Sequence, residues 1–221
     1  MKLFLHFLLP LLGCGCLSAA TVFTEGVLLR YDVPAGNEFA PSSAATGLAG
    51  SSLNLGSSAA NLEAGVLISG SVFFNPTVAS STAADAFTND QYFEFTLSSA
   101  DGRVFQPLTL SFLAANGGAS GPRGWSVRSS LDGFGQALAS SPVASLAPSM
   151  ENFTMTLTGF SMAAGDITFR IYGYSPGAGQ GIFFDQIEVA GLYQTVPELH
   201  SSALLGVGLV LVLRRRQRCS C

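Results

Sequence analysis

The strongest constraint on the fold is a two-residue alternation of apolar and polar side chains. In QYFEFTL (91–97), the side chains of Phe93, Phe95 and Leu97 fall on one face, and those of the residues between them on the other. Successive side chains of a β-strand point to opposite faces, so this pattern indicates a half-buried strand. The segment therefore predicts a β-rich fold.

Similar patterns recur along most of the chain. Further strands are predicted at 26–33, 66–74, 108–114, 124–132, 152–160, 167–174 and 181–191. The expected inward positions include Trp125, Val127, Phe153, Met155, Leu157, Ile167, Phe169 and Ile171, with Arg128 and Arg170 outward. Turn signals such as Asp101-Gly102 and Asp132-Gly133 separate the segments.

About eight strands without a convincing helix predict an all-β, antiparallel two-sheet β-sandwich of jelly-roll type. An immunoglobulin-like sandwich is the structural alternative. The lack of crossover helices argues against a parallel α/β sheet.

The N-terminal segment 1–20 has the composition of a secretory signal peptide. One positive residue, Lys2, precedes an apolar run, and small residues end the segment at Ser18 and Ala20. We therefore predict cleavage by signal peptidase near Ala20. In the alternative reading, the residues before Cys14 resemble a lipobox and Cys14 is acylated. Both readings predict export.

Between residues 21 and 197 the chain contains no histidine, cysteine or lysine. This absence excludes Ser-His-Asp and Cys-His nucleophile systems, His or Cys zinc sites and catalytic lysines from that region. Five arginines stand against thirteen acids, a balance of minus eight, which disfavours nucleic acid as a partner. The remaining catalytic option is a carboxylate pair, as in glycoside hydrolysis.

No cofactor is expected, although the composition would permit calcium. Calcium binds carboxylates and carbonyl oxygens in loops, and the candidate ligands are Asp85, Asn89, Asp90 and Asp185. The simpler reading is that these are surface loop residues without a metal.

Trp125 and Asp185 are the candidate ligand-binding residues. Trp125 follows a turn that could present its ring to a sugar, but its register with Val127 favours core packing. Counting back in twos from Val189 and Ile187 places Asp185 on the inward register, where a carboxylate needs a partner. A bond to backbone amides or to Arg123 is the simpler reading; a calcium ligand or sugar-hydroxyl acceptor is the alternative.

The C-terminal segment 195–218 predicts a short transmembrane helix. Its uncharged apolar run, 201–213, has 13 residues. As a helix it would be about 20 Å long, shorter than the roughly 30 Å hydrocarbon core of a bilayer. The arginines that follow would hold its end at the cytoplasmic face and leave the preceding domain outside. A short apolar helix that ends in a cluster of arginines indicates a segment held only transiently in the membrane.

This segment, VPELHSSALLGVGLVLVLRRRQR, resembles the sorting signals of PEP-CTERM proteins. The matching residues are the Pro-Glu motif at Val196, Pro197 and Glu198 and the cluster of Arg214, Arg215 and Arg216. The resemblance implies that an exosortase in the inner membrane recognises and removes the tail. Leu199 stands where the family usually has a second proline. Residues 90–191 likewise resemble the jelly-roll ectodomains common in this family.

These features divide the chain into a signal peptide (1–20), a β-sandwich ectodomain (21–194) and a sorting signal (195–218). We expect a non-enzymatic protein of the cell envelope or extracellular matrix. Its expected partners are signal peptidase, exosortase, the inner membrane transiently and extracellular polysaccharide. The alternative is a secreted carbohydrate-binding module or carboxylate-pair glycoside hydrolase, and a third option is an anchored protein whose tail is never cut.

Overall fold

The structure is a computed structural model that describes residues 21–32, 39–56, 62–66, 71–117, 122–141, 146–178 and 181–195, with the backbone alone at 62–66. The predicted signal cleavage position, Ala20, and the predicted sorting residues Val196, Pro197, Glu198, Arg214, Arg215 and Arg216 lie outside these residues. Among the helices that the structure describes, none has the length and apolar character needed to cross a membrane.

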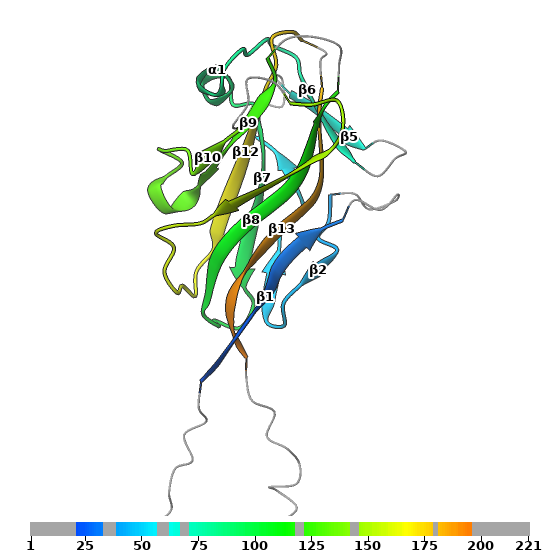
Figure 1. Cartoon of the computed structure of the whole chain (residues 1–221). Helices are drawn as coiled ribbons and strands as arrows, with labels where there is room; N and C mark the ends of the chain where they lie inside the picture. The colour runs from blue at the N-terminus through cyan, green and yellow to red at the C-terminus, as the bar shows by residue number, and fades with distance from the viewer. Residues whose placement is uncertain are drawn as a thin grey trace, which may run out of the picture. The chain divides into compact units, whose positions relative to one another are not determined.

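Two antiparallel sheets face each other, as the alternation predicts (Figure 1). Within the described residues, the first sheet contains β1 (Val22–Tyr31), β2 (Ser43–Ala44), β5 (Leu62–Val66), β6 (Val72–Pro76), β8 (Phe105–Asn116), β11 (Glu151–Thr156) and β13 (Ile182–Thr195). The second contains β3 (Leu48–Gly50), β4 (Asn54–Leu55), β7 (Tyr92–Ser99), β9 (Gly124–Ser129), β10 (Ala139–Ser140) and β12 (Ile167–Tyr174). The two-sheet antiparallel β-sandwich is therefore confirmed.

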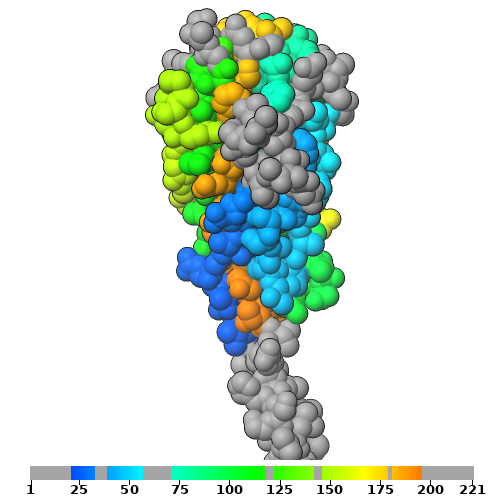
Figure 2. All heavy atoms as spheres, turned by 90° about the vertical axis from the view of Figure 1, so that its right-hand side faces the viewer, coloured from blue at the N-terminus to red at the C-terminus, as the bar shows by residue number. Residues whose placement is uncertain are grey.

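The first sheet brings together strands that are far apart in the sequence. Its order is β11-β8-β13-β1-β2, so the last strand lies between β8 and the first strand. Figure 2 views the edge of the sandwich where β1, in blue, lies beside the segment 39–56. As a result, the outer face of this sheet combines side chains from both ends and the middle of the chain.

The core between the sheets is rich in phenylalanine. Phe184 makes edge-to-face contacts with Phe74, Phe93 and Phe112, at centroid distances of 6.0, 5.2 and 5.6 Å. Such pairs stabilise by about 0.5–1.5 kcal/mol each beyond their burial. The expected inward residues are confirmed: Val127, Met155, Leu157, Ile167, Phe169 and Ile171 are buried, and Phe153 packs against the same core.

The expectation of no convincing helix is wrong within the described residues, which include the six-residue helix α1 (Ala83–Thr88) and the short 3-10 helix η2 (Ser130–Asp132). Thr82 caps α1, because its hydroxyl accepts a hydrogen bond from the Asp85 amide at 3.1 Å. The buried residue in α1 is Ala86, and a helix this short repeats no apolar stripe, so periodicity does not reveal it. The short strands β2, β3 and β4 lie within residues 40–61, a segment rich in Ala, Ser and Gly whose composition predicts a loop with a weak strand near Leu53 and Leu55.

Candidate functional site

Trp125 does not present its ring to solvent. It lies on β9 and is 3% exposed, with edge-to-face contacts to Phe112 at 4.9 Å and Phe153 at 5.2 Å. The core packing that the register of Trp125 favours is therefore confirmed, and the alternative, stacking on a sugar, is wrong for this buried ring. The physical reason is its register, since Trp125 shares the inward face with Val127.

Asp185 does not lie on the inward register that counting in twos predicts. It pairs with Leu113, an outward residue of β8, and the next aligned pair is Glu188 with Ser111. Two residues of β13, Gln186 and Ile187, thus lie opposite one residue of β8, which defines a β-bulge. The extra residue reverses the alternation, so Phe184 and Ile187 are buried while Asp185 faces outward.

The backbone of the bulge is stabilised by Asp185 itself. Gln186 has a φ of 48°, in the left-handed region that a residue with a long side chain rarely adopts. Its amide donates a 2.7 Å hydrogen bond to Oδ1 of Asp185. Asp185 therefore satisfies a backbone group that the bulge displaces from the ladder. Arg123, the partner that the sequence offers for Asp185, is buried and donates to Oδ1 of Asn116.

The calcium candidates near α1 have structural contacts. Asp85 lies in the first turn of the helix, and Asn89 at its C-cap donates to the Ser80 hydroxyl at 2.9 Å. Asp90 follows with a φ of 51°. In the part of the chain that the structure describes, no group of three or more His, Cys, Asp or Glu side chains is placed to hold a metal ion.

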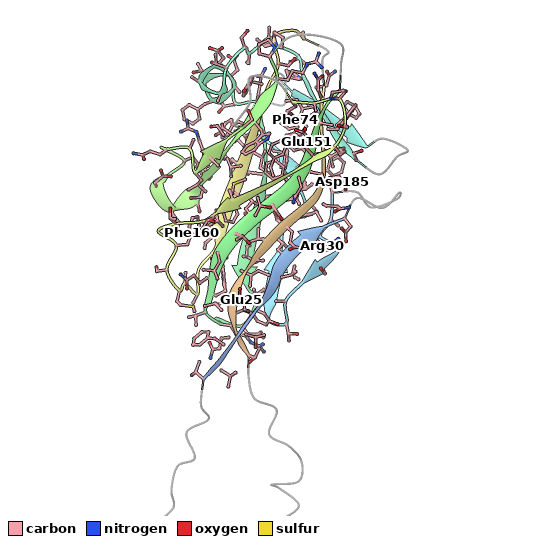
Figure 3. All side chains as sticks on the ribbon, viewed as in Figure 1. Glu25, Arg30, Phe74, Glu151, Phe160 and Asp185 are labelled. Carbon is pink, nitrogen blue, oxygen red and sulfur yellow. The ribbon has the colours of Figure 1, made fainter. Side chains whose placement is uncertain are left out.

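A depression of about 340 Å³ opens on the outer face of the first sheet. It crosses four adjacent strands, and its lining residues are Arg30 of β1, Ser111 and Leu113 of β8, Asn152 of β11, and Gln186 and Glu188 of β13. Figure 3 shows Arg30 and Asp185 on the two neighbouring strands β1 and β13. The volume falls within the range of small-molecule sites, roughly 300–1,000 Å³.

The strand register arranges these side chains in two rows. Asn152 pairs with Leu113, which pairs with Asp185 at the bulge. Two residues along β8, Ser111 pairs with Glu188, about 7 Å from the first row. Gln186, the inserted residue, lies between the rows.

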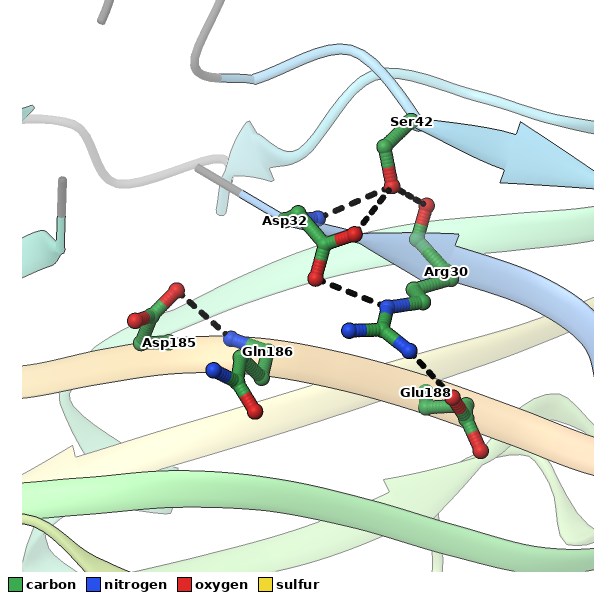
Figure 4. A network of polar contacts seen from close by, with 6 residues as sticks. All are labelled: Arg30, Asp32, Ser42, Asp185, Gln186 and Glu188. Carbon is green, nitrogen blue, oxygen red and sulfur yellow. Dashed lines mark hydrogen bonds and ion pairs between the residues drawn. The ribbon is translucent and has the colours of Figure 1, made fainter. Parts of the chain in front are cut away.

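Arg30 closes one side of the depression through two carboxylates. Its Nε donates to Oδ1 of Asp32 at 2.7 Å, and its Nη1 lies 3.3 Å from Oε2 of Glu188 (Figure 4). The hydrogen bond and negative charge of Asp32, with Glu188 adding to them, raise the pKa of Arg30. The Ser42 hydroxyl fixes Asp32 in turn, by accepting from its backbone amide at 3.0 Å. The result is a cross-strand clamp between β1 and β13.

The outer face of the second sheet is filled by arginine and aromatic side chains. Arg170 lies between the rings of Tyr92 and Phe134, with its Cζ 4.2 and 3.8 Å from their centroids, and donates to Glu94 at 2.9 Å. Arg128 lies 3.9 Å above the ring of Phe87 and donates to two backbone carbonyl oxygens in the loop after β9. The predicted outward register of Arg128 and Arg170 is confirmed, and their guanidinium groups hold this face together.

The sequence does not single out the residues that line the depression. Ser111 and Asn152 fall on outward positions of predicted strands, and that register is the signal that could have identified them. Arg30, Gln186 and Glu188 join them through the strand order, which crosses from β11 to β1. The alternation of apolar and polar residues within each strand does not reveal this strand order.

No family model matches the chain, and no curated protein matches it. Solved structures of similar fold include a family 29 carbohydrate-binding module from Piromyces equi, with 9% identity, a TM-score of 0.40 and coverage of 78% of this chain and 91% of that chain. The family 11 carbohydrate-binding module of a cellulosomal cellulase of Clostridium thermocellum has 15% identity, a TM-score of 0.37 and coverage of 76% and 95%.

Proposed function

We propose that the β-sandwich is a carbohydrate-binding module and that the depression on its first sheet is the sugar site. The observation that supports this role is the lining, which presents a guanidinium, a carboxylate, two carboxamides and a hydroxyl around one hollow. Carboxamides and hydroxyls both donate and accept, and the charged groups form stronger bonds. Sugar hydroxyls also donate and accept, so a polyol matches this set of groups.

Leu113 provides the apolar part of the same site. It lies in the row between Asn152 and Asp185 and is partly exposed. Sugar rings carry C–H groups on their faces, and an aliphatic side chain between polar groups matches such a surface. The depression therefore favours a ligand with both hydroxyl edges and a small apolar face.

The polar contacts favour binding over hydrolysis. A carboxylate-pair glycosidase needs one carboxyl that donates a proton to the leaving group. Glu188 instead accepts from Arg30, and Asp185 accepts from the Gln186 amide. Both carboxylates thus serve as acceptors that organise the face, and we propose a module without catalytic activity.

A glycan array probed with the full chain tests this role. We expect binding to at least one polysaccharide class, weakened about tenfold by Asn152→Ala, which removes one side chain that bonds the ligand. Thr156→Ala is the matched control, because Thr156 is also exposed on β11 but lies four residues away, outside the lining. Absence of binding to every glycan, or equal binding by Asn152→Ala, would contradict the proposal.

A second proposal concerns how the module reaches its ligand. We propose that the chain is exported and sorted as a PEP-CTERM protein, which the tail from Val196 to Arg218 supports through its Pro-Glu motif, apolar run and arginines. Intact-mass measurement from the native host should give a chain that ends near Glu198. A chain that retains Cys221 in a host with active exosortase would contradict this route, and a host without exosortase is the control.

A further inference from the structure

We propose that Gln186 is the specificity-determining residue of the depression and that the ligand is an uncharged glycan. This inference rests on the proposed carbohydrate-binding function and adds to it the ligand class and the residue that reads it. It is supported by the backbone of the bulge, the position of the Gln186 side chain and the charges that surround it.

The bulge lies within the site, between the aligned pairs Asp185–Leu113 and Glu188–Ser111. Without it, β13 would present Asp185 and Ile187 on one face and leave the space between the two rows unfilled. With it, Ile187 stays in the core at 1% exposure and Gln186 becomes an additional, exposed lining residue. Bulges re-aim side chains in this way next to functional sites.

The conformation of Gln186 is unfavourable and is maintained by its neighbour. A left-handed φ of 48° suits glycine or asparagine far better than glutamine. The hydrogen bond from its amide to Asp185 holds this conformation. A residue kept in an unfavourable conformation within a lining suggests that its side chain serves the site. Asp185 is then a positioning residue, which acts through Gln186.

The charges around the depression select against anionic ligands. Arg30, the cation among the described lining residues, already pairs with Asp32 and Glu188, and Asp185 adds a third carboxylate beside Gln186. One positive charge against three negative charges disfavours a uronate, because the ligand carboxylate would meet like charge. The carboxamide of Gln186 is neutral and both donates and accepts, which matches a pair of sugar hydroxyls.

Two variants of Gln186 in the full chain separate recognition from folding. Gln186→Gly removes the carboxamide and suits the left-handed backbone, so its Tm should equal or exceed that of the parent. Gln186→Asn also suits this backbone and restores a shorter carboxamide. The probes are the neutral glycan bound best on the array, an epimer of it, and the polysaccharide of the same linkage with uronate residues.

We expect Gln186→Gly to bind the neutral glycan about tenfold more weakly, and to lose most of the preference over the epimer. Gln186→Asn should recover part of that preference, an effect that a purely structural role would not produce. The parent should bind the uronate polymer at least about tenfold more weakly than the neutral polymer.

The contrary outcomes are distinct. If Gln186→Gly binds and discriminates as the parent does, Gln186 does not determine specificity although carbohydrate binding stands. Equal binding of the uronate polymer would overturn the charge selection. Absence of binding to any glycan by the parent would instead overturn the proposed function itself.

Discussion

Substitution of Phe134 tests which interactions hold the loop after β9 on the second sheet. The φ of this residue is 65°, a left-handed conformation that costs a residue with a Cβ about 1–2 kcal/mol. Its ring lies 3.8 Å from Cζ of Arg170, and its carbonyl accepts from Arg128 at 2.8 Å. The contact of the ring with Arg170 therefore stabilises the folded protein, whereas the left-handed backbone of Phe134 destabilises it. Phe134→Ala removes the ring and keeps the strain, whereas Phe134→Gly removes both.

The expected magnitudes follow from these contacts. A cation–π contact at a half-buried site contributes about 1 kcal/mol. Partial burial of the Phe134 side chain, which is of intermediate exposure, contributes about 1 kcal/mol more. Phe134→Ala should thus lower the free energy of unfolding by about 2 kcal/mol. Phe134→Gly should lower it by about 1 kcal/mol, after the relief of strain is reduced by the greater chain entropy of glycine.

Urea unfolding of both variants, compared at a common m-value, measures this difference. Leu131→Ala is the control, because Leu131 lies in the short 3-10 helix that precedes Phe134 and is 52% exposed, and its effect should stay within about 0.5 kcal/mol. A glycine variant no more stable than the alanine variant would refute the strain argument. Two variants as stable as the parent would show that the ring contact adds nothing.

Three further predictions concern the core and its strands. Phe184→Ala should lower the free energy of unfolding by about 3–5 kcal/mol in urea, because Phe184 is fully buried among three aromatic rings; a loss under about 1 kcal/mol would contradict this packing. Gly191→Ala should destabilise by about 3 kcal/mol, since its Cβ would overlap the Gln106 carbonyl oxygen, and unchanged thermal unfolding would contradict that overlap. Burial raises the pKa of Tyr31 above its usual range, and its hydroxyl donates a hydrogen bond to the Ser51 carbonyl at 2.6 Å. Because the unfolded chain ionises near pH 10 and the folded chain does not, stability should decline above about pH 10, and less steeply in Tyr31→Phe; equal declines in urea unfolding would refute this reasoning.

Much of the sandwich follows from local sequence, because alternation depends only on the pleat of each strand. Phe93, Phe95 and Leu97 are buried as the pattern predicts, and so are Ile167 and Ile171. The helix α1 could not be predicted in this way, because six helical residues are too few to show a repeating apolar pattern. Its cap, formed by Thr82 and the Asp85 amide, is visible only in three dimensions.

Trp125 and Asp185 show the two outcomes for individual residues. The register of Trp125 is local, and the sequence already favours the buried position that it occupies. Asp185 is misplaced by the same counting, because a bulge is a property of a strand pair. It arises where Gln186 and Ile187 face a single residue of β8, and β13 alone does not encode that alignment.

The sequence by itself determined an all-β chain, the inward faces of its main strands, and the absence of histidine, cysteine and lysine from residues 21–197. These properties are local or compositional. Only the tertiary structure decided that Arg30 and Glu188, 158 positions apart, meet across neighbouring strands, and that Gln186 joins them in the lining of the depression. The physical reason is that a sheet forms its outer surface from strand order and register, which long-range pairing sets after the local pattern is fixed.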